Sequence, residues 1–176
     1  MMSDRRRHFE ALALPHLDAA YNLARWLTRS PVDAEDVVQD AMLRAFRSFD
    51  QVRGSDVRPW LMAIVRNGCR DRGRRPHQRR EVPLPLGAPG PELVFEGPDP
   101  EAQALRASEA RRLRATIATL PDDFREVLIL REMEDLSYRE IAEVVGAPIG
   151  TVMSRLARAR ALLKETWMAE ERHGLR

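Results

Sequence analysis

The sequence predicts an all-α fold, with two small helical domains joined by a proline-rich linker. Apolar residues recur at intervals of three and four along several segments, which is the spacing of one helix face. The charges fall into three blocks: residues 1–80 carry 16 basic and 10 acidic side chains, residues 81–105 carry 0 and 5, and residues 106–176 carry 13 and 12. We therefore expect one domain over residues 1–80, a linker over 81–105 and a second domain over 106–170.

The composition argues against several classes of protein. No apolar run is long enough to cross a membrane, so direct membrane insertion is not expected. The N-terminus lacks the long apolar core of a secretory signal, and we expect a cytoplasmic protein. Cys69 is the single cysteine and the 4 histidines are scattered without ligand spacing, so we expect no disulfide, no metal and no cofactor.

Two helices are expected at the start of the first domain. An apolar stripe that includes Leu14 and Leu17 predicts a helix over residues 9–29. Asp33 is the expected N-cap of a second helix, which runs to about Phe49. The expected inward face of the second helix consists of Val37, Ala41, Phe46 and either Leu43 or Ala45.

A third helix is expected to begin near Arg58, with a proline in its first turn. From Arg66 to Arg80 the sequence holds seven arginines and one acidic residue. Clustered arginines beside Asn67 suit single-stranded or distorted DNA, because guanidinium groups hold phosphates and the amide can meet a base edge. The polar loop over residues 50–57 offers a pocket for an unstacked base. A basic tail that merely aids solubility is the alternative interpretation.

The linker and the scaffold of the second domain follow. Residues 81–100 hold six of the twelve prolines and three of the nine glycines, which predicts an extended connector. A helix is expected from about Pro100 to Thr119, and Asp122 is the expected N-cap of the next helix. The expected inward residues of these two helices are Ala104, Leu105, Leu113, Ile117, Phe124, Val127, Leu128, Leu130 and Met133.

A stretch that begins at Ser137 predicts two helices joined by a tight turn. Ser137 and Glu140 have the spacing of a capping box, and Gly146 stands where a helix ends through a residue with positive φ. The helix that follows Pro148 has one apolar face and no acidic residue before Lys164. A short basic helix after a tight turn fits the major groove of B-DNA. The alternative is an ordinary solvated helix.

Taken in order, these segments resemble a bacterial sigma factor of the extracytoplasmic-function group, in the sigma-70 family. The resemblance covers roughly residues 10–165. DAEDVVQDAMLRAFRSFD is similar to the family helix that binds the clamp helices of RNA polymerase. RPWLMAIVRNGCRDRGRR resembles the helix that reads the minus-ten element. LPDDFREVLILREMEDLSYREIAEVVGAPIGTVMSRLARAR resembles the minus-thirty-five domain.

The resemblance implies three groups of site residues. Core polymerase would be bound by Asp36, Gln39, Asp40 and Arg44. The minus-ten element would be read by Val52, Arg53, Trp60, Arg66, Asn67, Arg70 and Arg74. The minus-thirty-five element would be read by Thr151, Ser154, Arg155, Arg158 and Arg160. Met153 and Ala157 depart from the family pattern, which leaves the preferred minus-thirty-five sequence open.

The resemblance implies that the chain binds core RNA polymerase at its clamp helices and flap and recognises promoters for it. It also implies a role in a stress or envelope response. No catalysis and no small-molecule substrate are expected. No acidic segment precedes the first domain, so inhibition is expected from a separate anti-sigma factor. A stand-alone helix-turn-helix regulator would need a dimer interface. A nuclease or recombinase would need clustered carboxylates or a nucleophile, and Tyr21 and Tyr138 are expected to be structural.

Overall fold

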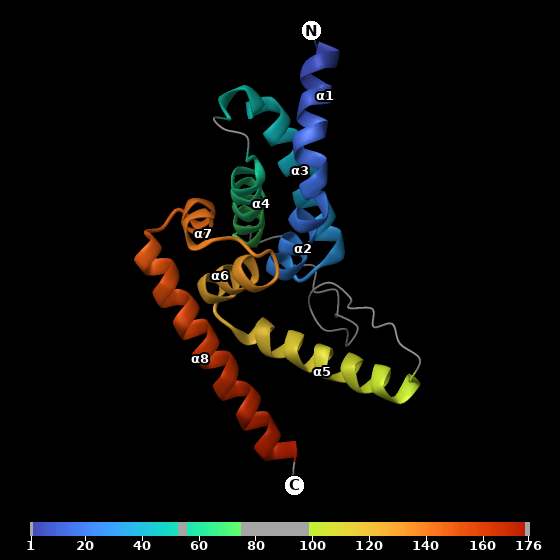
Figure 1. The fold of residues 1–176 in the computed structure, drawn as a ribbon, viewed down its shortest axis with the longest axis vertical. Helices are drawn as coiled ribbons and strands as arrows, with labels where there is room; N and C mark the ends of the chain where they lie inside the picture. Colours follow the sequence, from blue (N-terminus) through green and yellow to red (C-terminus); the bar gives the residue numbers. More distant parts are fainter. Residues whose placement is uncertain (1, 53–55, 75–98, 175–176) are drawn as a thin grey trace.

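The computed structural model describes residues 2–52, 56–74 and 99–174, and every regular element within these ranges is helical. The α-helices are α1 (Met2–Ala13), α2 (Leu17–Thr28), α3 (Pro31–Ser48), α4 (Arg58–Gly73), α5 (Pro100–Thr119), α6 (Asp122–Glu132), α7 (Tyr138–Val145) and α8 (Ile149–Gly174). Two 3₁₀ turns, η1 (Leu14–His16) and η2 (Phe49–Gln51), follow α1 and α3. The all-α prediction is confirmed, and α5 to α8 form the expected four-helix unit (Figure 1). Below, α1–α4 are the N-terminal half and α5–α8 the C-terminal half.

The first predicted helix is two helices in the structure. The prediction of one helix over residues 9–29 is wrong, because Pro15 lacks an N–H and η1 interrupts the chain there. The two leucines beside the interruption do not face the core: 50% of Leu14 is exposed, and Leu17 is also exposed. Leu23, further along α2, is fully buried.

The predicted N-cap of α3 is also wrong. Ser30 occupies the cap position, and its Oγ accepts a hydrogen bond from the backbone N–H of Asp33 at 3.2 Å. Pro31 then takes the first helical position, where an N–H would have no partner. The Asp33 carboxylate instead binds Arg72 of α4, with Nε 2.7 Å from Oδ1. Of the two alternatives for the inward face, Ala45 is buried, whereas 53% of Leu43 is exposed.

Helix α5 has the predicted bounds but a shorter buried face. Ala104 and Leu105 are exposed, contrary to expectation, because the first turns of α5 project away from the other helices (Figure 1). Burial begins at Ala110. Further along, Arg112 ties α5 to the end of α8: Nη2 donates to the carbonyl of Trp167 at 2.8 Å, and the guanidinium lies over its ring.

Two further predictions about α6 are wrong. Asp122 is the first residue of the helix, because Pro121 occupies the cap position. The Asp122 carboxylate binds Arg125 within the same helix. Met133, which follows α6, is exposed. The inward positions Val127, Leu128 and Leu130 are buried as predicted.

The helix-turn-helix prediction is confirmed. Ser137 Oγ accepts from the N–H of Glu140 at 3.3 Å, and Glu140 Oε2 accepts from the N–H of Ser137 at 2.7 Å, which completes the capping box. Gly146 ends α7 with φ of 65°. The carbonyl of Pro148 accepts from the first turn of α8. The inward residues of α8 are buried at Val152, Leu156 and Ala159 and half-buried at Leu163.

The two halves share one apolar core. Buried residues of α2, α3 and α4 join those of α6, α7 and α8 in a single cluster. Helix α4 packs on α7 and α2 packs on α6 (Figure 1). A smaller cluster holds α1 against α3 and α4, and consists of Phe9, Ala13, Ala45, Phe49, Val57 and Leu61. Within the described ranges, no helix has both the length and the apolar character that a membrane span requires.

Candidate nucleic-acid interface

The predicted minus-ten residues lie on α4 and in the loop before it. Asn67 is exposed on α4, and Arg74 is exposed at the C-cap that follows it. Val52 and Trp60 are half-buried, because both pack against the smaller apolar cluster. Arg53 lies outside the described residues. The exposed amide of Asn67 stays close to the helix, since its Oδ1 accepts a hydrogen bond from Arg66 Nη1 at 3.3 Å.

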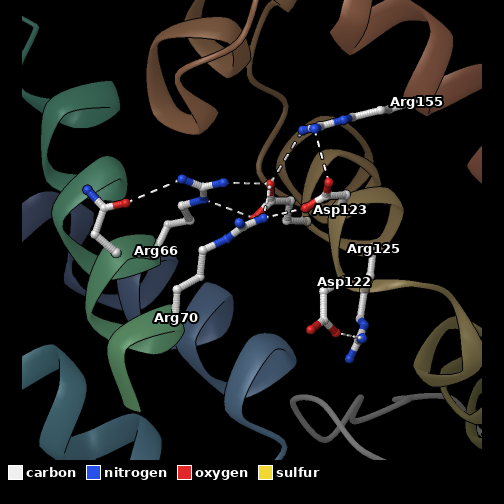
Figure 2. Close-up of polar contacts among 8 residues, drawn as sticks. Arg66, Arg70, Asp122, Asp123, Arg125 and Arg155 are labelled. Carbon is white, nitrogen blue, oxygen red and sulfur yellow. Dashed lines mark hydrogen bonds and ion pairs between the residues drawn. The ribbon is translucent and has the colours of Figure 1, made fainter. Parts of the chain in front are cut away.

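The other two residues of α4, Arg66 and Arg70, point across to α6 (Figure 2). Arg66 binds Glu126 with two parallel bonds, Nε to Oε2 and Nη2 to Oε1, both of 2.9 Å. Arg70 Nη2 lies 3.0 Å from Glu126 Oε1 and 2.5 Å from Asp123 Oδ1. From α8, Arg155 Nη2 lies 3.0 Å from Asp123 Oδ2. We call these five residues the arginine–carboxylate cluster.

The centre of the arginine–carboxylate cluster is shielded from water, whereas Asp123 at its edge is 46% exposed. The side chain of Glu126 is 2% exposed and that of Arg66 is 11% exposed. The pKa of Asp123 lies below its usual range, chiefly because Arg70 donates a hydrogen bond to the carboxylate and also because Arg155 and Arg66 lie nearby. No signal in the sequence indicated that Asp123 and Glu126, three positions apart on α6, bind arginines of α4 and α8.

The remaining minus-thirty-five residues lie along α8. Ser154 and Arg158 are exposed, and Ser154 Oγ donates to the carbonyl of Thr151 at 3.0 Å. Thr151 is half-buried at the start of the helix. Arg160 is exposed and binds Glu132 of α6, with Nε 3.1 Å from Oε1. Ser154 and Arg158 therefore form the open part of this surface, whereas Arg155 belongs to the cluster.

The predicted polymerase-binding residues lie on the outer face of α3. Gln39, Asp40 and Arg44 are exposed, and Asp36 binds Arg72 with 2.9 Å between Oδ2 and Nη2. Beside Gln39 an open apolar groove runs between α1 and α3, and its lining includes Phe9, Leu14, Leu17, Met42, Leu43 and Phe46. Within the described residues, no three His, Cys, Asp or Glu side chains come together as a metal site would require.

Glu134, which lies between α6 and α7, contacts the start of α4 in the other half. Arg58, at the start of α4, donates to the backbone carbonyl of Glu134 and lies 3.7 Å from its Oε2. The carboxyl is buried, and among the described residues its Oε1 has no hydrogen-bond partner. Burial raises the pKa of Glu134, and Arg58 offsets the effect only in part. Burial therefore opposes ionisation of this carboxyl group more strongly than Arg58 favours it.

We expect Glu134→Gln to leave the protein as stable as the wild type at pH 7, or more stable by about 1 kcal/mol. Because the folded-state pKa is raised, the stability that Glu134 contributes is present below its ordinary pKa and is lost as pH rises. The free energy of unfolding of the wild type should therefore rise relative to that of the variant as pH falls from 7 to 5. Urea unfolding at both pH values measures this difference, and a variant clearly less stable at pH 7 would contradict it.

Glu140→Gln is the matched control with the opposite sign. The pKa of Glu140 is lowered by its hydrogen bonds with Ser137. Its contribution is therefore present above the ordinary pKa of a glutamate and is lost as pH falls through the lowered value. At pH 7 this variant should be less stable than the wild type by roughly 0.3–1 kcal/mol, because glutamine can keep the hydrogen bond to the Ser137 N–H but lacks the negative charge that favours a helix N-terminus. The difference in stability between this variant and the wild type should become smaller at acidic pH.

Comparison with protein families identifies both halves. The model for Sigma-70 region 2 matches residues 12–80, and the model for Sigma-70, region 4 matches residues 110–163. The chain is 36% identical over 150 residues to the ECF RNA polymerase sigma-E factor of Haemophilus influenzae, which covers 81% of this chain and 77% of that protein. It is 33% identical over 157 residues to the ECF RNA polymerase sigma factor SigE of Mycolicibacterium smegmatis, covering 89% of this chain and 60% of that protein.

Solved structures agree with this result. The sigma factor RpoE, in complex with the anti-sigma factor NepR from Bartonella quintana, matches with a TM-score of 0.67 and 30% identity, over 90% of this chain and 96% of that one. CnrH, in complex with the cytosolic domain of CnrY, matches with a TM-score of 0.65 and 28% identity, over 93% of this chain and 90% of that one. Helix-turn-helix geometry, both family models and these relatives together show that the chain belongs to the extracytoplasmic-function group of sigma-70 RNA polymerase sigma factors.

Proposed function

We propose that this chain, without catalytic chemistry of its own, directs core RNA polymerase to promoters by reading two separated DNA elements. Membership of the family makes it a transcription initiation factor that binds core RNA polymerase and promoter DNA. One observation carries the two-element proposal: each half presents a basic helix with exposed polar side chains, α4 with Asn67 and α8 with Ser154 and Arg158. The reading units would be residues 1–80 and 106–170, joined by the linker 81–105.

Helix α4 would read the melted minus-ten strand. Asn67 offers an amide that can donate to and accept from one base edge, and it is exposed for that purpose. The loop from Phe49 to Val57 would hold an unstacked base, with Val52, Arg53 and Trp60 beside it. Phosphates of the strand would be held by Arg66, Arg70 and Arg74.

Helix α8 would lie in the major groove of the minus-thirty-five element. Arg158 and Ser154 would face the bases, since both are exposed on the same helix one turn apart. Thr151, Arg155 and Arg160 would contact the flanking backbone. A good bidentate contact to one base discriminates by roughly 1–3 kcal/mol, which is too little for tight binding by one helix. The affinity must therefore come from polymerase.

The outer face of α3 is the proposed polymerase surface. Asp36, Gln39, Asp40 and Arg44 supply its polar groups. The apolar groove beside them supports this assignment, because exposed leucines such as Leu14 and Leu43 beside polar residues are typical of a surface that another protein covers. The protein would work in the cytoplasm, where polymerase is found.

A separate anti-sigma factor is the proposed inhibitor. The solved relative RpoE was determined in complex with the anti-sigma factor NepR, and CnrH was determined in complex with the cytosolic domain of CnrY. By analogy, such a protein would hold this chain until a stress or envelope signal releases it.

Co-purification with core polymerase, followed by run-off transcription on genomic DNA, tests the proposed function. The expected result is a stable complex and a new set of transcript start sites. Failure to join polymerase, or joining it without any change in start sites, would overturn the proposal. A footprint obtained without polymerase would favour a stand-alone regulator instead.

Arg158→Ala is expected to relax recognition at one base position of the minus-thirty-five element. Loss of one bidentate contact should reduce discrimination there by roughly 1–3 kcal/mol, while other positions keep theirs. Transcription from a library of promoters with randomised minus-thirty-five bases measures the effect. Arg106→Ala removes an exposed arginine of α5 and is the control. An equal loss on all sequences would show that Arg158 contacts phosphate.

A further inference from the structure

The helix that is proposed to lie in the major groove carries a large apolar side chain on its open surface. Helix α8 lies at the edge of the molecule (Figure 1), and Met153 in its second turn is 52% exposed. Met153 belongs to neither apolar cluster of the described residues. A single exposed apolar residue is common on protein surfaces, so it is the position of Met153 that is informative. It directly precedes Ser154, which is proposed to face the bases.

The direction in which Met153 points follows from the helix period. The buried residues Val152, Leu156 and Ala159 define the inward side of α8. Successive residues are about 100° apart around the helix axis, which places Met153 and Arg158 about 140° apart, on the two sides of the outward direction. The same two residues are separated by about 7.5 Å along the axis, which is the height of about two base pairs. We therefore expect their side chains to reach different base pairs.

The surface of α8 between these two side chains is built from small residues. Over residues 149–161 they are Gly150, Ser154, Ala157 and Ala161, and all four are exposed. A Cβ atom added at Gly150 would meet nothing within 4 Å, so the packing of the described chain does not require glycine there. Small residues allow the helix backbone to approach a ligand closely. A longer side chain beside them, such as that of Met153, can then reach the base edges.

The major groove offers one kind of apolar group to such a side chain. Thymine presents its 5-methyl group there, whereas the other groups that the four bases present are hydrogen-bond donors and acceptors. The thioether of methionine donates no hydrogen bond and accepts only weakly, so it is a poor partner for those groups. Its flexible, polarisable chain adapts instead to an apolar surface. Contact between Met153 and a thymine methyl group would remove apolar surface of both from water.

We propose that Met153 selects thymine at one position of the minus-thirty-five element, through contact with the 5-methyl group. This inference rests on the proposed function of α8 and adds a specificity residue to it. Arg158 would read its own base pair through hydrogen bonds, so the helix would combine one polar and one apolar contact. The sequence from Ile149 to Lys164 has no acidic residue, which suits a DNA surface better than a mixed protein interface.

The first measurement is a selection of promoters by the holoenzyme, the complex of this chain with core polymerase. The promoters carry randomised bases in the minus-thirty-five element, and sequencing of the transcribed templates gives the preferred base at each position. The wild-type holoenzyme should enrich thymine at one position where the Met153→Ala holoenzyme accepts all four bases more equally. A thymine preference that Met153→Ala leaves unchanged, or the lack of any such preference, would overturn the inference.

The second measurement removes the methyl group alone. In the selected promoter, deoxyuridine replaces thymidine at the position that depends on Met153, which keeps the base pair and all its hydrogen-bonding groups. Competition with a fluorescent promoter duplex should show that the wild-type holoenzyme binds the deoxyuridine promoter about fourfold more weakly, the effect of one methyl group left in water. The Met153→Ala holoenzyme should bind both promoters equally. An equal loss in wild type and variant would show that another group senses the methyl, and would overturn the inference.

Met168→Ala is the matched control. Met168 lies on the same helix and is 49% exposed, but it is about 22 Å farther along the helix axis than Met153. The control holoenzyme should keep both the thymine preference and the fourfold difference between the two promoters. If Met168→Ala removed them as completely as Met153→Ala does, the effect would not belong to position 153 and the inference would be rejected.

Failure of this inference and failure of the proposed function give different results. Run-off transcription by the wild-type holoenzyme tests the proposed function. New start sites without any position that depends on both the methyl group and Met153 would leave that function intact and reject only the inference. Start sites that do not change when the chain joins core polymerase would reject the proposed function, and the inference with it.

Discussion

Leu23→Ala is expected to lower the free energy of unfolding by about 2–5 kcal/mol, the cost of removing a large apolar side chain from a packed core. Leu23 is 0% exposed and belongs to the cluster that both halves share. Truncation leaves a cavity next to α2, which packs against α3, α4 and α6, so neighbouring helices cannot all move in to fill it. Urea unfolding followed by circular dichroism measures the change.

Leu43→Ala is the control for this prediction. It removes the same atoms from the next helix, but 53% of Leu43 is exposed in the apolar groove. The expected loss is within about 0.5 kcal/mol. If both variants lost the same stability, the assignment of Leu23 to the core and of Leu43 to an open surface would be wrong.

Asn67→Ala is expected to reduce open-complex formation by roughly 5- to 150-fold, the range that corresponds to one lost base contact of 1–3 kcal/mol. The proposed polymerase-binding residues lie on α3 and Asn67 lies on α4, so binding of core polymerase should change less than about twofold. Permanganate reactivity of the melted strand measures open complexes, and co-purification measures polymerase binding.

Asn22→Ala tests whether the effect belongs to position 67. It removes the chain's other asparagine, which lies half-buried on α2. Open-complex yield should stay near the wild-type value once the two proteins are matched for folded fraction. An unaltered yield for Asn67→Ala would reject its proposed role in reading the minus-ten strand.

Local signals made the helix-turn-helix predictable. Ser137, Glu140 and Gly146 act through bonds that close within one turn or through the backbone of a single residue, so the sequence contains the whole interaction. Competing local signals caused the error at α3. Ser30 and Asp33 are both good caps, and Pro31 decides between them because it suits the first helical position.

Burial against a partner was not predictable from periodicity. Leu14, Leu17 and Leu43 have the spacing of an inward face, but spacing does not tell whether the same chain or another protein covers that face. The exposed positions of Asn67 and Arg158 agree with the sequence analysis, and their roles in DNA reading stay predictions.

The pairing of Arg66 with Glu126 had no local signal at all. The two residues are 60 positions apart and meet only because the halves pack together. No motif or spacing in the sequence links these two positions. Which outward surfaces meet depends on the packing of α4 on α7 and of α2 on α6.

The apolar core that spans both halves bears on how a cell could store this protein. Separation of the halves would expose these apolar side chains to water, and free molecules would then associate through them. A protein that binds both halves would therefore inhibit this chain and also keep its free form soluble. On warming, the free protein without such a partner should precipitate at a lower temperature than the complex.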